Sequence, residues 1–345
     1  MRRSLLFPLA GLLALQAPKA ATGLAQVQSR AISLRMSAVD YKVAFMFPGQ
    51  GAQTVGMAAN ICNEVPAAKV LFDKASAILG YDLLSKCVNG PKEELDSTAV
   101  AQTAIFVTSM ACVEKLRQES PDAVDSCTVA MGLSLGEYSA LCFAGAFSFE
   151  DGVRLTKARG EAMQAAADAD RSGMVAVIGL DVAAVEKICE EARAKSGKPV
   201  TIANYLVDGN YAVSGAIEAC EAVKEIAVAS GARMAVPLAV AGAFHTSFME
   251  PAVEPLRKAL AAVEIKPPRI PVVSNVDAVP HSDPQEIREI LARQVTSPVQ
   301  WERIVTTMVK APEFQRSYEL GPGTVCRGIV KRFGKKLEVV NVQPL

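Results

Sequence analysis

One stretch of this chain, residues 127–144, constrains its fold more than any other. Residues 127–131 are a short apolar run typical of a buried strand, and residues 137–144 have the composition of a helix start. Between them lies Gly132-Leu-Ser134-Leu-Gly136. A strand that turns this sharply into a helix places Ser134 at the apex, and so tight a turn needs glycine where a Cβ atom would clash. The stretch therefore predicts an α/β fold with Ser134 as a candidate nucleophile, although a plain Gly-Ser loop has the same pattern.

The composition narrows the functional classes. The chain has 345 residues, half of them hydrophobic, so it can bury a real core in one large domain or two. Its formal net charge is zero, and we expect no nucleic-acid partner. None of the 8 cysteines is spaced from another as C-x-x-C, which argues against a zinc or redox motif, and we expect no metal. With only 2 histidines, an imidazole base has to be His245 or His281.

Further strands and helices follow from the apolar spacing. Residues 41–47 form a strand of buried type that runs into Pro48-Gly-Gln50-Gly-Ala-Gln53, a glycine-rich turn without the Lys-Ser/Thr of a phosphate loop. Residues 67–79 and 99–116 show helical spacing. Ser148 is a candidate N-cap for a helix that contains Arg159. A helix arginine is most often a solvated surface charge, so the pattern alone leaves the role of Arg159 open.

The middle of the chain predicts a second, smaller domain. Between residues 174 and 238 the expected elements alternate as β-α-β-β-α-β, which is the ferredoxin-like arrangement. We therefore expect this domain, residues 172–237, to be inserted into a large catalytic domain made of residues 39–171 and 238–345.

The two histidines differ in their surroundings. His245 lies in a glycine-containing loop directly before a helix expected at residues 249–262. His281 stands between Pro280 and Pro284 and has the features of a solvent-exposed turn residue. His245 is therefore the better candidate for a base, although a buried histidine with a purely structural partner is the commoner case.

Residues 1–38 have the features of a targeting presequence. Arg2 and Arg3 precede an apolar segment at residues 5–15, as in a secretory signal, and residues 23–37 contain arginine and serine but no acidic residue, as in an organelle transit segment. This two-part pattern predicts import into a plastid, with the mitochondrion as the alternative. The apolar run is short and contains Pro8, so we expect no membrane anchor in the mature form.

Six motifs follow one another along the chain. They are Phe47-Pro-Gly-Gln-Gly-Ala-Gln53, Gly132-Leu-Ser-Leu-Gly-Glu-Tyr-Ser-Ala-Leu141, Arg159-Gly-Glu-Ala-Met-Gln164, Gly242-Ala-Phe-His245, Pro298-Val-Gln-Trp301 and Glu319-Leu-Gly-Pro-Gly323. In this order they resemble the motifs of the malonyl-CoA:acyl carrier protein transacylase family of fatty-acid synthesis. The resemblance runs from about residue 43 to residue 340. It implies an α/β-hydrolase-like large domain with an inserted ferredoxin-like small domain.

The resemblance also implies roles for individual residues. Ser134 would be the nucleophile and His245 its base, with Gln294 at the position that orients the histidine. The backbone N–H groups of Gln50 and Leu135 would form the oxyanion hole, and Arg159 would bind the malonyl carboxylate. The substrates would be malonyl-CoA and an acyl carrier protein with its phosphopantetheine arm, without a cofactor. Arg233, Lys331 and Arg332 match positions that would contact the carrier protein, and we expect a monomer.

Three other functions are compatible with the same residues. A serine thioesterase or esterase on a similar core would use water in place of the pantetheine thiol. It would need an acidic partner for the histidine, and five aspartates are candidates for that partner: Asp151, Asp168, Asp170, Asp181 and Asp208. The other two are a non-catalytic scaffold that binds acyl carrier protein and a transferase for another acyl group.

Overall fold

The structure is a computed structural model that describes residues 39–344. The predicted presequence, residues 1–38, lies outside the described residues. Residues from Val39 onward group into one compact unit.

A five-stranded parallel sheet forms the centre of the large domain, in the order β7-β2-β1-β8-β9. Its strands are β1 (Val43–Phe47), β2 (Val129–Gly132), β7 (Val272–Val273), β8 (Arg316–Leu320) and β9 (Glu338–Val342). Every residue of β1 and β2 is buried, which is why these strands are apolar runs without alternation. Strand β9 was not anticipated from the sequence, because this edge strand is mostly half-buried and only weakly patterned.

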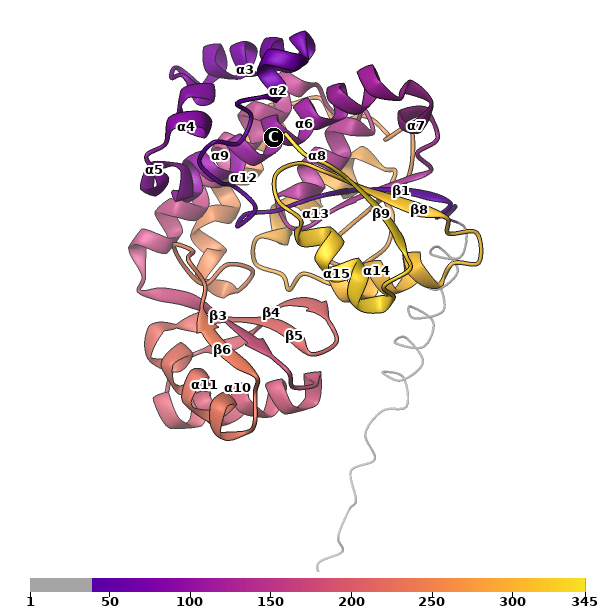
Figure 1. Ribbon diagram of the computed structural model, residues 1–345. Coiled ribbons are helices and arrows are strands. Elements are labelled where there is room, and N and C mark those ends of the chain that lie inside the picture. Colours follow the sequence, from indigo (N-terminus) through magenta and orange to yellow (C-terminus); the bar gives the residue numbers. More distant parts are fainter. Residues whose placement is uncertain (1–38, 345) are drawn as a thin grey trace, which may run out of the picture. The chain divides into compact units, whose positions relative to one another are not determined.

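Helices cover both faces of the parallel sheet. The first part of the chain contributes α2 (Ile61–Glu64), α3 (Pro66–Leu79), α4 (Leu83–Asn89), α5 (Lys92–Asp96), α6 (Thr98–Glu119), α7 (Pro121–Asp125), α8 (Gly136–Phe143) and α9 (Phe149–Ala169). The last part contributes a 3-10 turn (Ser247–Met249), α12 (Glu250–Ala261), α13 (Pro284–Gln294), α14 (Trp301–Lys310) and α15 (Val325–Phe333). Figure 1 shows α14 and α15 on one face of the sheet and α6 and α8 on the other.

Successive side chains of β1 point to opposite faces of the parallel sheet, and each face has its own hydrophobic core. Phe45 and Phe47 belong to the core beneath α6 and α9, whereas Ala44 and Met46 belong to the core with Trp301 of α14. Helix α6 is long and apolar enough to cross a membrane by length and composition. It is nevertheless the central core helix of this domain, and most of its residues are buried.

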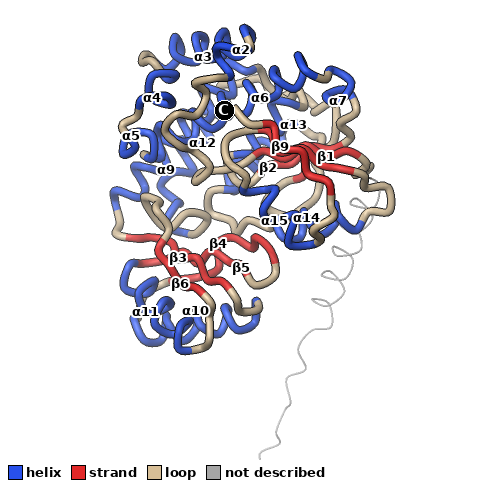
Figure 2. Tube along the Cα trace, in the orientation of Figure 1, coloured by secondary structure: helices blue, strands red, loops and turns tan. Residues whose placement is uncertain are grey.

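The second sheet is antiparallel and separate from the first (Figure 2). Its strands are β3 (Ser172–Ile178), β4 (Val200–Val207), β5 (Asn210–Ala216) and β6 (Met234–Pro237), in the order β4-β5-β3-β6. Helices α10 (Val182–Ser196) and α11 (Ile217–Ala229) pack on one face of it. This order and helix placement are ferredoxin-like. The predicted fold class, a large α/β domain with a small ferredoxin-like domain, is confirmed.

Candidate active site

Ser134 lies at the sharp turn between β2 and α8, as the sequence predicted. Its φ of 52° is in the left-handed region, which is uncommon for a residue with a side chain and stores backbone strain. A Cβ atom on Gly132 would lie 1.9 Å from the carbonyl carbon of Gly136, and one on Gly136 would lie 2.1 Å from the Phe47 oxygen. Both flanking glycines are therefore required by the close approach of the backbone to itself and to β1.

His245 lies directly beside the serine. The Ser134 Oγ and His245 Nε2 atoms are 2.8 Å apart, and Nδ1 is 2.9 Å from the backbone oxygen of Gln294. Because a carbonyl oxygen only accepts, Nδ1 carries the hydrogen and Nε2 is left to accept from the serine hydroxyl. His245 is buried, and this burial together with the positive charge of Arg159 lowers the pKa of the imidazole to about 4. The ring is neutral at pH 7.

Arg159, on α9, is only 1% exposed, so it is not the solvated surface charge that a helix arginine most often is. Its Nη1 donates to Gln102 Oε1 at 2.7 Å, and its Nη2 donates to Gln294 Oε1 at 2.9 Å and to Ser134 Oγ at 3.1 Å. The guanidinium also lies over the Tyr138 ring, 5.5 Å from its centroid. Among residues 39–344, no carboxylate forms an ion pair with Arg159. The site thus contains a buried cation without an anionic partner.

Gln294 ends α13 and contacts every part of this cluster. Its backbone oxygen accepts from His245, so the contact with the histidine is made by the main chain. Its side-chain Nε2 donates to the backbone oxygen of Ser134 at 3.1 Å and to Glu137 Oε2 at 2.7 Å. The amide oxygen is consequently directed at Arg159.

Sequence reasoning missed Asn275, Glu137 and Gln102. Asn275 Oδ1 accepts from the Ser134 N–H at 2.6 Å, and its Nδ2 donates to the Gly132 oxygen at 2.7 Å. Asn275 follows β7, the parallel neighbour of β2, and polar residues at adjacent carboxyl ends meet at one edge of a sheet. That rule could have identified it. Glu137 and Gln102 are buried polar residues in apolar helices, a weaker signal.

The two residues expected to form the oxyanion hole, Leu135 and Gln50, each lie in a turn that follows a strand of the parallel sheet. Leu135 directly follows the serine at the start of α8, and Gln50 is in the turn after β1. The Gln50 side chain donates to Thr98 Oγ1 at 3.3 Å. In the described part of the chain, neither backbone N–H donates a hydrogen bond to another residue.

His281 corrects a sequence expectation. It was predicted to be a solvent-exposed turn residue, but it is 7% exposed and lies between Asp277 and Glu286. The proline-flanked loop folds back on the start of α13, and two carboxylates compensate for burial of the ring. None of the five candidate aspartates of the thioesterase hypothesis contacts His245, whose Nδ1 partner is a backbone carbonyl.

The three predicted carrier-protein contacts differ from one another. Arg233 precedes β6 and is exposed. Lys331 is half-buried, and its Nζ donates to the Lys335 oxygen at 3.1 Å and to the Leu337 oxygen at 2.6 Å, so it stabilises the turn before β9. Arg332 is exposed, and its Nη2 donates to the Asp208 oxygen at 3.3 Å.

A hollow of about 340 Å³ borders His245 on the side of the small domain, with Thr201 and Ser214 of the antiparallel sheet on its wall. Within residues 39–344 no group of three or more side chains is arranged to hold a metal ion.

Comparison with known proteins identifies the class of enzyme to which this chain belongs. Residues 44–342 match the family model described as the acyl transferase domain. The mitochondrial malonyl-CoA-acyl carrier protein transacylase of Mus musculus is 42% identical over 295 residues, which are 83% of this chain and 77% of that protein. An acyl carrier protein S-malonyltransferase from Vibrio cholerae has a similar structure, with a TM-score of 0.81, 38% identity, and coverage of 88% of this chain and 97% of that one.

A third similar structure is a malonyl-transacylase in complex with a type II polyketide synthase acyl-carrier protein. It has a TM-score of 0.82 and 34% identity, and the match covers 88% of this chain and 96% of that one. The chain is thus an acyl transferase by class. Within that class it belongs to the malonyl-CoA:acyl carrier protein transacylase family.

Proposed function

We propose that this protein transfers the malonyl group of malonyl-CoA to the phosphopantetheine thiol of acyl carrier protein, through a malonyl ester on Ser134, and so supplies fatty-acid synthesis. The observation that carries the proposal is the buried Arg159 guanidinium. It lies 3.1 Å from Ser134 Oγ and has no carboxylate partner among the described residues. An anionic acyl group bound to the serine would provide that partner.

The first half-reaction uses the pair of Ser134 and His245. The hydroxyl oxygen attacks the thioester carbon while Nε2 takes its proton, which the neutral imidazole can accept. The carbonyl oxygen becomes an oxyanion, for which the N–H groups of Gln50 and Leu135 are the proposed donors. One such donor is worth roughly 3–4 kcal/mol in related sites. The carbon–sulfur bond then breaks, and the CoA sulfur leaves with the proton from Nε2.

The second half-reaction reverses these steps with another thiol. The pantetheine thiol gives its proton to His245 and attacks the malonyl ester carbon, and the Ser134 oxygen leaves with that proton. The thioester bond is exchanged for another thioester, so the cycle balances without a cofactor. A covalent intermediate of this kind predicts ping-pong kinetics.

Arg159 is the proposed specificity residue. Its planar guanidinium can form two parallel, charge-assisted hydrogen bonds to a carboxylate. An unpaired carboxylate in a closed pocket is costly, so a fixed cation favours malonyl over acetyl groups. Gln102 and Gln294 hold the guanidinium through amide oxygens, which leave its charge available for substrate.

Intact mass spectrometry after brief mixing with malonyl-CoA tests the proposal. Wild type should gain one malonyl group, and Ser134→Ala should gain none because, within residues 39–344, no other hydroxyl is hydrogen-bonded to His245 Nε2. Adding acyl carrier protein should then discharge the adduct and produce malonyl carrier protein. Release of free malonate instead would support a thioesterase, and a malonylated Ser134→Ala would show that the wrong serine had been assigned.

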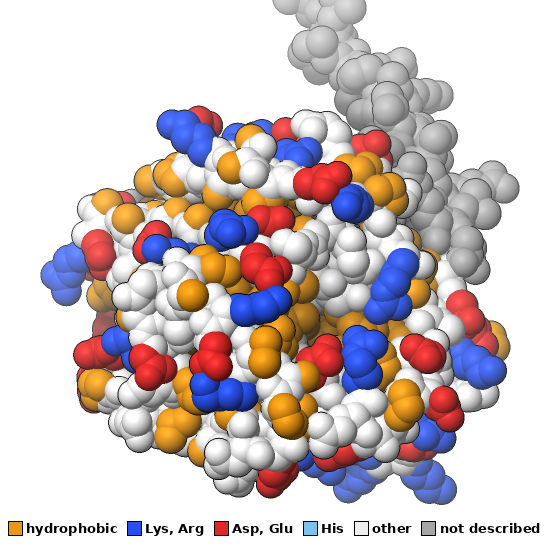
Figure 3. All heavy atoms as spheres, turned by 90° about the horizontal axis from the view of Figure 1, so that it is seen from above, with side chains coloured by type: hydrophobic (Ala, Val, Ile, Leu, Met, Phe, Trp, Pro, Cys, Tyr) orange, Lys and Arg blue, Asp and Glu red, His pale blue; other side chains and the backbone are white. Residues whose placement is uncertain are grey.

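Carrier-protein recognition is proposed for the exposed Arg233 and Arg332, since acyl carrier proteins are acidic and a basic rim would attract them. The face drawn in Figure 3 carries charges of both signs. Arg233→Glu should slow transfer to the carrier protein and leave acylation by malonyl-CoA unchanged. Unlike Arg233→Glu, Lys331→Glu should lower the melting temperature, because the Lys331 ammonium group donates to two backbone carbonyls. Equal loss of both half-reactions in Arg233→Glu would contradict the assignment.

Domain boundaries, assembly and location complete the proposal. The boundaries are those expected above, 39–171 with 238–345 and 172–237, and the assembly is a monomer. A plastid is the proposed location. The mitochondrion is the alternative, because the mouse relative is described as mitochondrial. A reporter fused to residues 1–40 distinguishes them.

A further inference from the structure

The loop between β7 and α13 determines the geometry of the Ser134 turn. Its Asn275 binds the Ser134 N–H and the Gly132 carbonyl, the two backbone groups that bracket the strained residue. The loop is itself tightly turned: Ala278 has a φ of 60°, its N–H donates to the Ser274 oxygen at 3.0 Å, and the Ser274 N–H donates to the Val279 oxygen at 3.0 Å. A side chain near the end of the loop adds contacts to these backbone hydrogen bonds.

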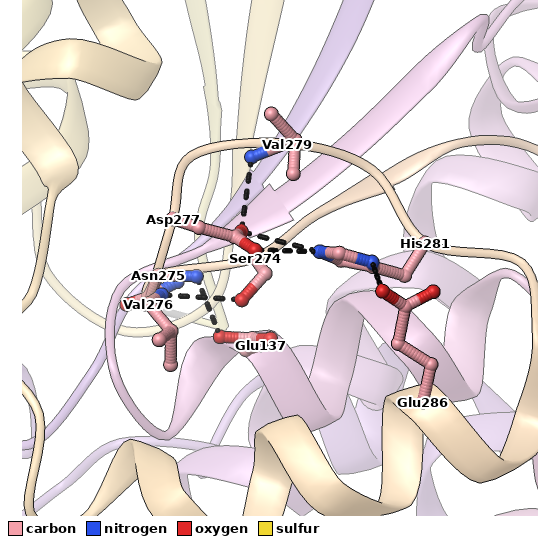
Figure 4. Close-up of polar contacts among 8 residues, drawn as sticks. All are labelled: Glu137, Ser274, Asn275, Val276, Asp277, Val279, His281 and Glu286. Atoms are coloured by element: carbon pink, nitrogen blue, oxygen red, sulfur yellow. Dashed lines mark hydrogen bonds and ion pairs between the residues drawn. The ribbon is translucent and has the colours of Figure 1, made fainter. Parts of the chain in front are cut away.

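His281 supplies these contacts from the end of the loop (Figure 4). Its Nε2 lies 3.0 Å from Asp277 Oδ2, and its Nδ1 lies 3.0 Å from Glu286 Oε1 at an ion-pair distance without directed hydrogen-bond geometry. A neutral imidazole would turn a lone pair toward one of these carboxylates, so the two carboxylates together stabilise the imidazolium form of His281. Burial lowers the pKa of His281, but the hydrogen bond and charge of Asp277, followed by the charge of Glu286, outweigh burial and raise it. The third titratable group that interacts with this site is Glu137 of α8.

Both carboxylates connect His281 to the serine. Asp277 belongs to the same loop as Asn275, whose own N–H donates to Glu137 Oε2 at 3.0 Å. Glu286 lies in the first turn of α13, and Gln294 ends that helix. The imidazolium therefore joins the loop that holds the Ser134 N–H to the helix that holds His245 and Arg159.

We propose that His281, as an imidazolium between Asp277 and Glu286, is a positioning residue for Ser134. It touches no reacting atom and acts through Asn275 and Gln294. The inference rests on the proposed acylation of Ser134. It predicts that loss of the charge loosens the turn and lowers the reactivity of the serine, with little effect on binding of malonyl-CoA.

His281→Gln tests this inference at 25 °C, with the melting temperature of the variant measured alongside. The single-turnover rate constant for acylation by malonyl-CoA should fall about tenfold, since small misplacements of reacting groups cost up to about a hundredfold, while KM stays within about twofold. Glu289→Gln is the matched control, because it removes a carboxylate from the same helix at an exposed ion pair with Arg257. It should change neither quantity. A lower melting temperature with an unchanged acylation rate would overturn the inference.

The pH profile separates positioning from simple packing. The ratio of the wild-type to the His281→Gln acylation rate cancels the titration of His245, which both proteins share. The ratio should be largest near pH 6 and should fall toward one as the pH rises and His281 of wild type loses its proton. A ratio that is constant from pH 6 to pH 10 would contradict the role of the imidazolium.

Two further measurements keep the test decisive. A fluorophosphonate labels an activated serine without malonyl-CoA, so its labelling rate compares wild type with His281→Gln even if the proposed malonyl transfer fails. We expect the same tenfold decrease, and equal labelling rates would overturn the inference alone. If His281→Gln does not fold, Glu286→Gln at a half-exposed side chain removes one partner, and we expect a smaller decrease of about threefold.

Discussion

At the scale of single residues, the site is unusual in how its buried charge is held. Arg159 is surrounded by amide oxygens and an aromatic ring rather than by a carboxylate. A carboxylate partner would neutralise the guanidinium and compete with an anionic substrate. Glutamine oxygens accept from Nη1 and Nη2, whereas Nε has no hydrogen-bond partner among the described residues. Glu137 is hydrogen-bonded to the Gln294 amide and forms no ion pair with Arg159 within residues 39–344. Burial raises the pKa of Glu137 to about 7, so this carboxyl group is partly uncharged at neutral pH.

Removing the arginine should change both specificity and pH dependence. Arg159→Ala should lower kcat/KM for malonyl-CoA. The loss of transition-state stabilisation should be roughly 3–5 kcal/mol, as when one partner of a buried charge pair is removed. Acetyl-CoA, which lacks the carboxylate, should lose little. The malonyl-to-acetyl ratio of kcat/KM measures this effect, and an equal loss for both substrates would mean that Arg159 is structural.

The pH dependence follows from the depressed pKa of His245. Only the neutral imidazole accepts the serine proton, so activity falls as the pH drops through that pKa, which burial and then Arg159 lower to about 4. In Arg159→Ala the repulsion is gone, and the acidic limb of the profile should move upward toward the ordinary value of 6.5. Fluorophosphonate labelling between pH 4 and pH 8 reports this limb without the malonyl carboxylate. A limb at the same pH in both proteins would exclude electrostatic coupling.

The sequence predicted the residues that lie in short, ordered motifs, and missed those defined only by tertiary contacts. Ser134, His245, Arg159 and Gln294 lie together as the resemblance implied. His281 was misassigned because flanking prolines indicate a turn but do not reveal that α13 brings Glu286 against the ring. Local pattern cannot predict such a pairing across separate elements.

At the scale of elements, the packing of α6 against α9 sets the position of Arg159. The two helices approach closely at Gly160, where a Cβ atom would lie 2.6 Å from the Thr98 oxygen. Gly160 directly follows the arginine, so any displacement of α9 here moves the guanidinium. Apolar spacing predicted α6, and the Ser148 N-cap predicted α9, but neither signal could predict how close the two helices lie.

Gly160→Ala should therefore destabilise the fold and reduce malonyl selectivity together. We expect a loss of about 1–3 kcal/mol, as for an overpacked core, measured by urea denaturation. Gly328→Ala is the control, because this glycine is in helix α15 with open space around it. It should gain about 0.5–1 kcal/mol from reduced chain entropy. A neutral Gly160→Ala with unchanged selectivity would show that α9 adapts without moving Arg159.

At the scale of the whole molecule, the described part of the chain starts at Val39, and a protein shortened to this residue tests the predicted presequence. Tyr41 is only 2% exposed, and its N–H donates to Glu313 Oε1 at 3.2 Å, which ties the first described residues to the segment before β8. Starting the chain at Val39 preserves these contacts, so both half-reactions and the melting temperature should match those of the full chain. Starting it at Lys42 removes a buried aromatic side chain and should cost about 3–5 kcal/mol. Thermal unfolding of the two shortened proteins measures the difference. If the Val39 form is as unstable as the Lys42 form, residues 1–38 contribute to the folded enzyme and are more than a targeting presequence.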